Sequence, residues 1–166
     1  MRTLLLLLTG LGLLLRGPAP AAAQAEADER VAAATAAVLQ AHAEHIYRQA
    51  YLTLDPTSLA EAWGGEALLD MQEDLARLRA AGQYLDLQLE DLTVLRAMPL
   101  GAQRVRVITR EQWLVRVYQR DGQLLGHQRQ LVDNRYVVQR DDATWRIVEV
   151  DQEVVGGDRT LQPGEP

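Results

Sequence analysis

The chain has 166 residues, a net charge of −6 and no cysteine. Its stability must therefore come from packing, because no disulfide bond can form. Nucleic acids and anionic membranes are poor partners for a chain this acidic. Lysine is absent and alanine is abundant, a composition that suggests a GC-rich, bacterial genome.

The first 25 residues have the pattern of a secretory signal peptide. Arg2 precedes an apolar stretch at residues 4–15, which is too short to span a bilayer stably. Small residues follow and end in Ala23-Gln24-Ala25, an A-x-A cleavage site. We therefore expect cleavage after Ala25 and a secreted or periplasmic protein. The rest is expected to form a single domain at residues 26–154 and a flexible tail at residues 155–166.

Residues 26–54 contain neither glycine nor proline and are rich in alanine, which predicts one long helix. On this helix His42 and His45 fall on the apolar stripe, whereas Tyr47 and Tyr51 lie on the opposite side. Two of the three histidines are therefore expected to face the interior.

Two shorter helices are predicted next. Residues 55–58 end the long helix and cap a second one at residues 59–63, which Gly64-Gly65 stops. A third helix then runs to Ala81, and Gly82 provides its C-terminal stop.

After Gly82 the hydrophobic period changes from helical to alternating, which indicates strands. A phase slip near Glu90-Asp91 indicates a β-bulge, and Asp121-Gly122 is a strong hairpin signal. Four strands are expected, at about residues 85–94, 104–118, 125–140 and 144–154. This order predicts an α+β domain in which three N-terminal helices pack on a curved four-stranded antiparallel sheet.

A carboxylate interrupts the apolar face of the strand at residues 104–118. Counting by twos places Glu111 on the inward side, together with Val105, Val107, Thr109 and Trp113. A buried carboxylate is costly unless it is hydrogen-bonded, paired or neutralised, or faces a wet cavity. The sequence must therefore supply a partner for Glu111.

Two interpretations of Glu111 remain open. In one, a dyad of Glu111 with His42 or His45 acts as a general base in a closed cavity. In the other, which we favour, a core histidine or tyrosine, or an arginine, gives Glu111 a structural hydrogen bond or ion pair. A ligand-sized cavity lined by Glu111 and a histidine would favour the enzyme, and a closed apolar interior would exclude it.

Other chemistries find little support in the sequence. His42 and His45 with one carboxylate make a poor metal site, since no third histidine or cysteine lies nearby, and we expect neither a metal nor a cofactor. The one serine, Ser58, is explained by helix capping, and glycine-rich phosphate loops are absent.

Four stretches carry a resemblance to a known fold: "LDPTSLAEAW" (54–63), "LRAAGQYLDLQLEDLTVL" (78–95), "RVRVITRE" (104–111) and "NRYVVQRDDATWRIVEV" (134–150). They resemble the nuclear transport factor 2-like superfamily and, more narrowly, the IMS domain of cyanobacterial and plastid division proteins. The resemblance implies a cone-shaped sheet around a cavity and a non-catalytic domain that packs against other proteins. A role in division is not carried over, because the sequence lacks a transmembrane segment.

The outward side of the same strand mixes arginines with aliphatic and aromatic residues. Arg104, Arg106, Arg110 and Tyr118 are the candidate binding residues on this outer face, for a protein partner or a homodimer. The alternative is a solvated face with cross-strand pairs to acids such as Asp86 and Glu90. Trp113, on the inner face, is expected to line the cavity, which would take a small apolar ligand.

The leading hypothesis is therefore a secreted or periplasmic, non-catalytic binding or protein-interaction domain. The alternative is a small isomerase or hydrolase that uses a Glu/His dyad in the cavity of the cone.

Overall fold

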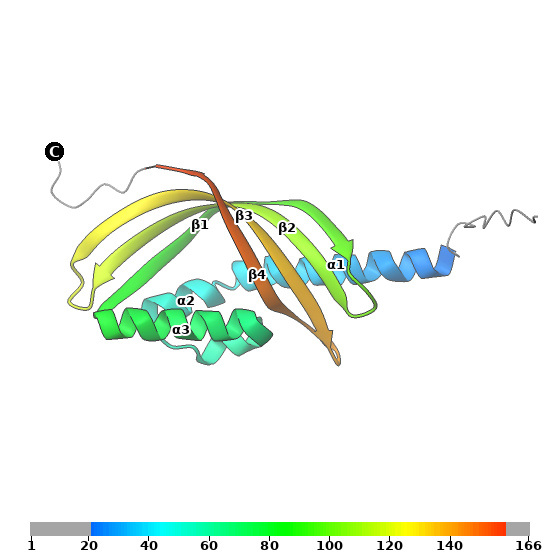
Figure 1. The fold of residues 1–166 in the computed structure, drawn as a ribbon, viewed down its shortest axis with the longest axis horizontal. Coiled ribbons are helices and arrows are strands. Elements are labelled where there is room, and N and C mark those ends of the chain that lie inside the picture. The colour runs from blue at the N-terminus through cyan, green and yellow to red at the C-terminus, as the bar shows by residue number, and fades with distance from the viewer. Residues whose placement is uncertain (1–20, 159–166) are drawn as a thin grey trace, which may run out of the picture.

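The computed structural model describes residues 21–158 and places the helices against the concave side of a curved antiparallel sheet (Figure 1). The helical elements are α1 (Ala21–Ala43), α2 (Ile46–Thr53), the 3₁₀ helix η1 (Thr57–Glu61) and α3 (Gly65–Ala81). The strands follow in the order β1 (Gln83–Pro99), β2 (Arg104–Gln119), β3 (Leu124–Asp141) and β4 (Thr144–Gly157). The prediction of an α+β domain with a four-stranded antiparallel sheet and N-terminal helices is confirmed.

Most of the predicted leader lies outside the described residues. Ala21 to Ala25, its last five residues, form the start of α1. At the other end of the domain, β4 continues to Gly157, beyond the predicted start of the tail. Among residues 21–158, no helix has both the length and the apolar character that crossing a membrane requires.

The prediction of one unbroken helix over residues 26–54 is wrong. The helix breaks at His45, whose φ of 54° is left-handed, and α2 starts in a new direction at Ile46. A left-handed non-glycine residue costs roughly 1–2 kcal/mol. The break lets α2 bury Ile46, Ala50 and Tyr51 under the sheet, and this tertiary packing outweighs local helix propensity.

The second predicted helix, at residues 59–63, is instead the 3₁₀ helix η1, and the segment after it ties the helices to the sheet. Trp63 forms a parallel bridge with Ile147 of β4. The Gly64 N–H donates to the Ile147 carbonyl at 2.8 Å, and the Ile147 N–H donates to the Ala62 carbonyl at 2.9 Å. The bridge and these two hydrogen bonds fix the position of Trp63 and of the N-terminus of α3.

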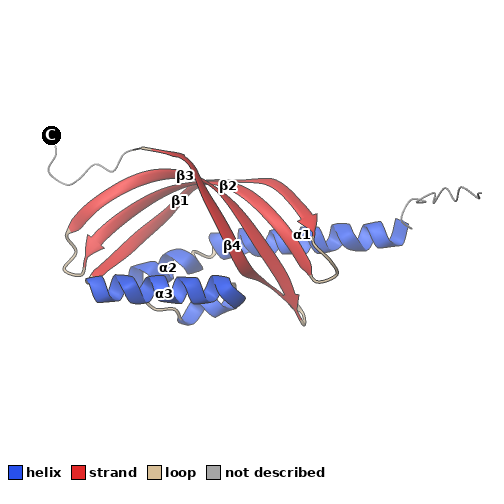
Figure 2. Cartoon of the chain, viewed as in Figure 1, coloured by secondary structure: helices blue, strands red, loops and turns tan. Residues whose placement is uncertain are grey.

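The sheet is strongly curved (Figure 2). The predicted bulge near Glu90-Asp91 is confirmed, because the register of β1 against β2 shifts between Leu89 and Asp91, and a second shift follows between Val94 and Arg96. Such bulges increase local bending and twist, so the sheet forms an arch with a concave inner face.

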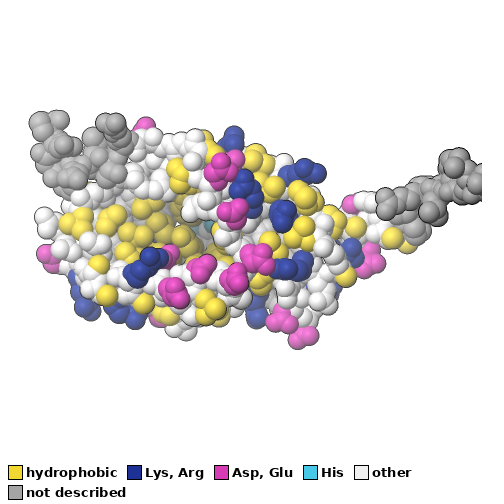
Figure 3. Space-filling view, viewed as in Figure 1, with side chains coloured by type: hydrophobic (Ala, Val, Ile, Leu, Met, Phe, Trp, Pro, Cys, Tyr) yellow, Lys and Arg dark blue, Asp and Glu magenta, His cyan; other side chains and the backbone are white. Residues whose placement is uncertain are grey.

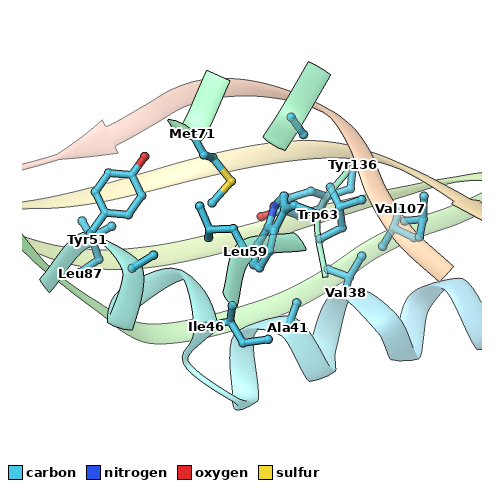
Figure 4. Packing of buried hydrophobic residues seen from close by; sticks show 14 of the residues in the cluster. Val38, Ala41, Ile46, Tyr51, Leu59, Trp63, Met71, Leu87, Val107 and Tyr136 are labelled. Carbon is cyan, nitrogen blue, oxygen red and sulfur yellow. The ribbon is translucent and has the colours of Figure 1, made fainter. Parts of the chain in front are cut away.

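The hydrophobic core fills the space between this concave face and the helices. Figure 4 shows side chains from α1, α2, η1, α3 and the sheet meeting there, among them Val38, Leu59, Trp63, Met71 and Val107. Val38, Leu59 and Val107 are fully buried. The core therefore holds the helices at fixed positions around the middle of the sheet.

Candidate functional site

Glu111 lies on the concave face and has no exposed surface, as the strand alternation predicts. Its Oε1 atom accepts hydrogen bonds from the Thr109 hydroxyl at 2.6 Å and the Tyr136 hydroxyl at 2.8 Å. Its Oε2 atom accepts from Trp113 Nε1 and Asn134 Nδ2, both at 2.8 Å. Within the described chain, Glu111 thus has four donors, which offset the cost of burying a carboxylate.

Strand geometry explains why these donors converge. Thr109 and Trp113 lie two residues before and after Glu111 on β2, so all three side chains share one face. On β3, Asn134 is paired with Thr109, and Tyr136, two residues further along, shares its face. The Glu111 site is therefore built entirely from two neighbouring strands.

His42, near the end of α1, adds another polar side chain to this cluster, from the helix layer on the concave side of the sheet. Tyr136 donates its only hydroxyl proton to Glu111, so His42 Nε2, 3.2 Å from the Tyr136 oxygen, carries a proton and donates to that oxygen. This tautomer leaves Nδ1 as an acceptor, and Nδ1 is buried without a hydrogen-bond partner among residues 21–158.

The same burial controls the charge of His42. Loss of solvent lowers the pKa of the imidazole, and attraction to Glu111, whose Oε1 lies 3.6 Å from Nε2, opposes that shift without cancelling it. His42 is therefore neutral at neutral pH. His42 and Glu111 are held together through Tyr136 and do not form a direct charged pair.

A cavity of about 410 Å³ opens beside this cluster, between the concave face and the helices. Figure 3 shows the hollow, with hydrophobic side chains around it and acidic side chains along α3. Its wall includes five aromatic rings of the described chain: Tyr47 and Tyr51 of α2, Trp63, Trp113 and Tyr136. The interior of the cone is thus an aromatic-lined cavity with Glu111 in its wall.

The rings form a contiguous cluster around Tyr47. The centroid of its ring lies 4.7 Å from that of Tyr51 and 6.0 Å from those of Trp63 and Trp113. Loss of solvent raises the pKa of Tyr47 to about 12, and it raises the pKa of Tyr51 and Tyr136 as well. The three phenols therefore stay protonated at neutral pH and remain hydrogen-bond donors.

The structure brings together only some of the predicted site residues. His42, Glu111 and Trp113 line the cavity. His45 does not join them, because the left-handed break turns it away from the sheet and leaves it exposed. Among the described residues, no cluster of three or more His, Asp or Glu side chains is arranged to hold a metal ion.

The predicted outer-face residues lie on the opposite, convex side of the sheet. Arg110 makes a two-pronged ion pair with Asp133, at 2.7 and 2.8 Å, and Arg104 pairs with Glu149. Tyr118 stacks on Tyr84 with ring centroids 5.1 Å apart. Other pairs neutralise this face, namely Arg116 with Asp86, Arg129 with Glu90, and Arg135 with Asp151 and Glu153.

Sequence reasoning missed several cavity residues. Tyr47 and Tyr51 were expected on the far side of the helix, and the break at His45 rotates them inward. Asp70 and Asp74 of α3 also line the cavity, and Asp74 accepts a hydrogen bond from the Tyr51 hydroxyl at 3.3 Å. The i, i+4 spacing of each pair placed its members on one helix face, but no sequence signal oriented that face.

No protein-family model matches the sequence, and no curated protein matches it. Solved structures do. The intermembrane space region of the chloroplast protein ARC6 superposes with a TM-score of 0.63 at 18% identity, over 74% of this chain and 96% of that one. A hexachlorocyclohexane dehydrochlorinase, LinA type 2, superposes with a TM-score of 0.53 at 15% identity, over 83% of this chain and 95% of that one.

The chain has a nuclear transport factor 2-like fold. The resemblance predicted from the sequence, to this superfamily and to the intermembrane-space domain within it, is confirmed at the level of the fold. Of these two examples, one is a region of a chloroplast protein and the other is an enzyme, so the fold alone does not assign the function.

Proposed function

We propose that this chain is a non-catalytic binding domain that holds a small organic molecule in the cavity of its concave face. The observation that carries the proposal is the cavity of about 410 Å³, whose wall combines aromatic rings with a few polar groups. Ligand sites of roughly 300–1,000 Å³ commonly have this composition. The volume lies near the lower end of that range, which favours a small ligand.

The hydrogen bonds of Glu111 support binding over catalysis by this carboxylate. A general base needs a free lone pair within reach of the substrate proton. Both Glu111 oxygens already accept two hydrogen bonds, and the side chain has no exposed surface. Removing those donors would be costly, so Glu111 acts as a structural acceptor that orders the cavity wall.

The second candidate is an enzyme that transfers a proton through His42. The ligand-sized cavity lined by both Glu111 and His42 is the outcome that favours such an enzyme, and so does the unpartnered Nδ1 atom. The chain from His42 to Tyr136 to Glu111 would orient a neutral imidazole as a base. The Nδ1 atom is itself buried, however, so a substrate reaches it only if α1 or the cavity wall moves. We therefore rank binding above catalysis.

The test of the binding proposal is titration with N-phenyl-1-naphthylamine, a neutral probe whose fluorescence rises in apolar surroundings. We expect one probe molecule to bind per chain. Val150→Trp, at a half-exposed position in the cavity wall, should fill the cavity entrance and weaken binding about tenfold or more.

Val154→Trp is the matched control. Val154 lies on the same face of β4, is 62% exposed and is outside the cavity wall, so the probe affinity should not change. Equal affinities for the parent and Val150→Trp would place the probe elsewhere and contradict the proposal.

We also propose that the domain works outside the cytoplasm, as a secreted or periplasmic protein. The support is the signal-peptide pattern of the first 25 residues. Intact-mass analysis of the protein recovered from the cell exterior or periplasm should give an N-terminus at Glu26. Recovery of only the uncleaved chain, in the cytosol, would rule out export.

Docking of a protein partner or a second copy on the outer face stays a prediction. Arg106 is its best probe, since it makes no ion pair within residues 21–158, and Arg110 is its neighbour on the face. If the face docks a partner, Arg106→Glu with Arg110→Glu should weaken association measured by sedimentation. The melting temperature should fall only slightly, through loss of the exposed Arg110–Asp133 ion pair. Unchanged association would show that the face is only solvated, as its many internal ion pairs suggest.

A further inference from the structure

The charged side chains in the cavity wall are all acidic. Glu111, Asp70 and Asp74 line the cavity, and among the described residues no arginine does. His42, the remaining titratable base in the wall, is neutral at neutral pH because burial lowers its pKa. A ligand in this cavity therefore meets a negative potential, which Arg77, outside the wall, offsets at Asp74 but not at Asp70.

Each acid has a different relation to the cavity. Glu111 is fully buried behind its four donors, so it does not contact a ligand directly. Asp74 forms an ion pair with Arg77, an exposed residue outside the cavity wall. Asp70 is exposed at the rim and makes no ion pair within the described chain, so it is the acid that can contact a ligand directly.

The aromatic rings reinforce this preference. The negative face of an aromatic ring attracts a cation. Three of the rings also donate a hydrogen bond to a carboxylate: Tyr51 to Asp74, and Trp113 and Tyr136 to Glu111. Such a bond polarises the donor and makes its ring more electron-rich, which strengthens attraction to a cation.

We infer that the cavity selects a small organic cation, such as a quaternary ammonium compound or a protonated amine, because aromatic rings and the unpaired Asp70 carboxylate line it together. This inference rests on the proposed binding function and names the chemical class of its ligand. Anions are disfavoured by the same charges, and a neutral apolar molecule gains only the burial of its surface.

The test compares three probes of similar shape: choline, the neutral 3,3-dimethylbutan-1-ol and the anionic 3,3-dimethylbutanoate. Binding is followed by the indole N–H resonances in an NMR titration at about 0.15 M salt, where the Debye length is about 8 Å. Trp63 and Trp113 line the cavity and Trp145 does not, so Trp145 is an internal reference. We expect choline to bind about tenfold more tightly than the alcohol, and the anion to bind most weakly.

Two variants of α3 test whether the preference for choline comes from the cavity rim. Asp70→Asn removes a charge from the cavity rim and should weaken choline binding several-fold while leaving binding of the alcohol unchanged. Glu73→Gln removes the same charge from an exposed position of the same helix outside the wall, and it should change choline affinity by less than about twofold.

An alcohol that binds as tightly as choline would overturn the inference and leave the proposed function standing. Equal weakening by Asp70→Asn and Glu73→Gln would also overturn it, because attraction would then come from the overall charge of the surface. If no probe moves the Trp63 or Trp113 resonance, the inference fails, and the naphthylamine titration decides the binding function separately.

Discussion

Replacing Glu111 with alanine is expected to lower the free energy of unfolding by about 3–5 kcal/mol. The substitution strands four buried donors, on Thr109, Trp113, Asn134 and Tyr136, and opens a void in the sheet face. Glu111→Leu restores the volume but leaves the same donors unpaired, so it should also be strongly destabilising.

Glu111→Gln should cost only about 1 kcal/mol, because the amide can satisfy the same cluster. Its oxygen can accept from Trp113 and Asn134, while the hydroxyls of Thr109 and Tyr136 can rotate to accept from its nitrogen. The Tyr136 hydroxyl can then donate to His42 Nε2, with the imidazole in its other tautomer. Urea denaturation of the three variants gives these differences. Glu153→Gln, the same change at an exposed position, is the control and should cost less than about 1 kcal/mol.

A functional residue held under strain would give the opposite result. In that case the Ala, Gln and Leu variants would match or exceed the stability of the parent and lose activity instead. Melting curves of this kind would reject the structural role of Glu111 and favour the hypothesis of an enzyme with a Glu/His dyad.

The second large effect is a pH dependence that His42 confers. Its pKa is lowered by burial in the native state, whereas an unfolded chain has a histidine pKa near 6.5. Between these two pKa values the imidazole is protonated in the unfolded chain and neutral in the native chain. The free energy of unfolding therefore keeps its full His42 contribution above about pH 6.5, and that contribution falls as the pH drops toward the lowered native pKa. The slope can reach about 1.4 kcal/mol per pH unit.

His42→Gln should flatten that slope in the range below about pH 6.5, because glutamine does not titrate and its amide can still donate to Tyr136. The ion-paired acids Asp86, Glu90 and Asp133 have lowered pKa values, so their contributions persist at the upper end of this range and are lost only at lower pH.

The control for His42 is His45→Gln, at an exposed position three residues further along, which should keep the pH dependence of the parent. The measurement is the free energy of unfolding in urea at several pH values. A parent and a His42→Gln variant with the same slope would show that the buried imidazole does not set the acid sensitivity.

Much of the Glu111 site could be predicted because it is built on strands. The alternation of β2 fixes Glu111 inward, on the same face as Thr109 and Trp113. The pairing of Thr109 with Asn134 also depends on a register shift between Val117 and Tyr118, which no sequence signal marked. The two donors on β2 could therefore be predicted from the sequence, whereas the two on β3 could not.

The resemblance implied a cavity, and Trp113 was expected in its wall, but the residues that the helices contribute to that wall were not predicted, because they depend on how the helices are oriented. No glycine or proline marks the break at His45, and the direction of α2 is decided by burial of Tyr51 against the sheet. The faces of Tyr47, Asp70 and Asp74 follow from that packing. Helix propensity is a local quantity, so it contained no information on these contacts.

The most direct measurement is a crystal structure of the protein with N-phenyl-1-naphthylamine bound. The account predicts the probe between Tyr47, Trp63 and Trp113, with the four hydrogen bonds of Glu111 intact. A probe bound on the outer face, or a Glu111 oxygen released from its donors to contact the probe, would contradict the claim that the cavity is a binding site around a structural carboxylate.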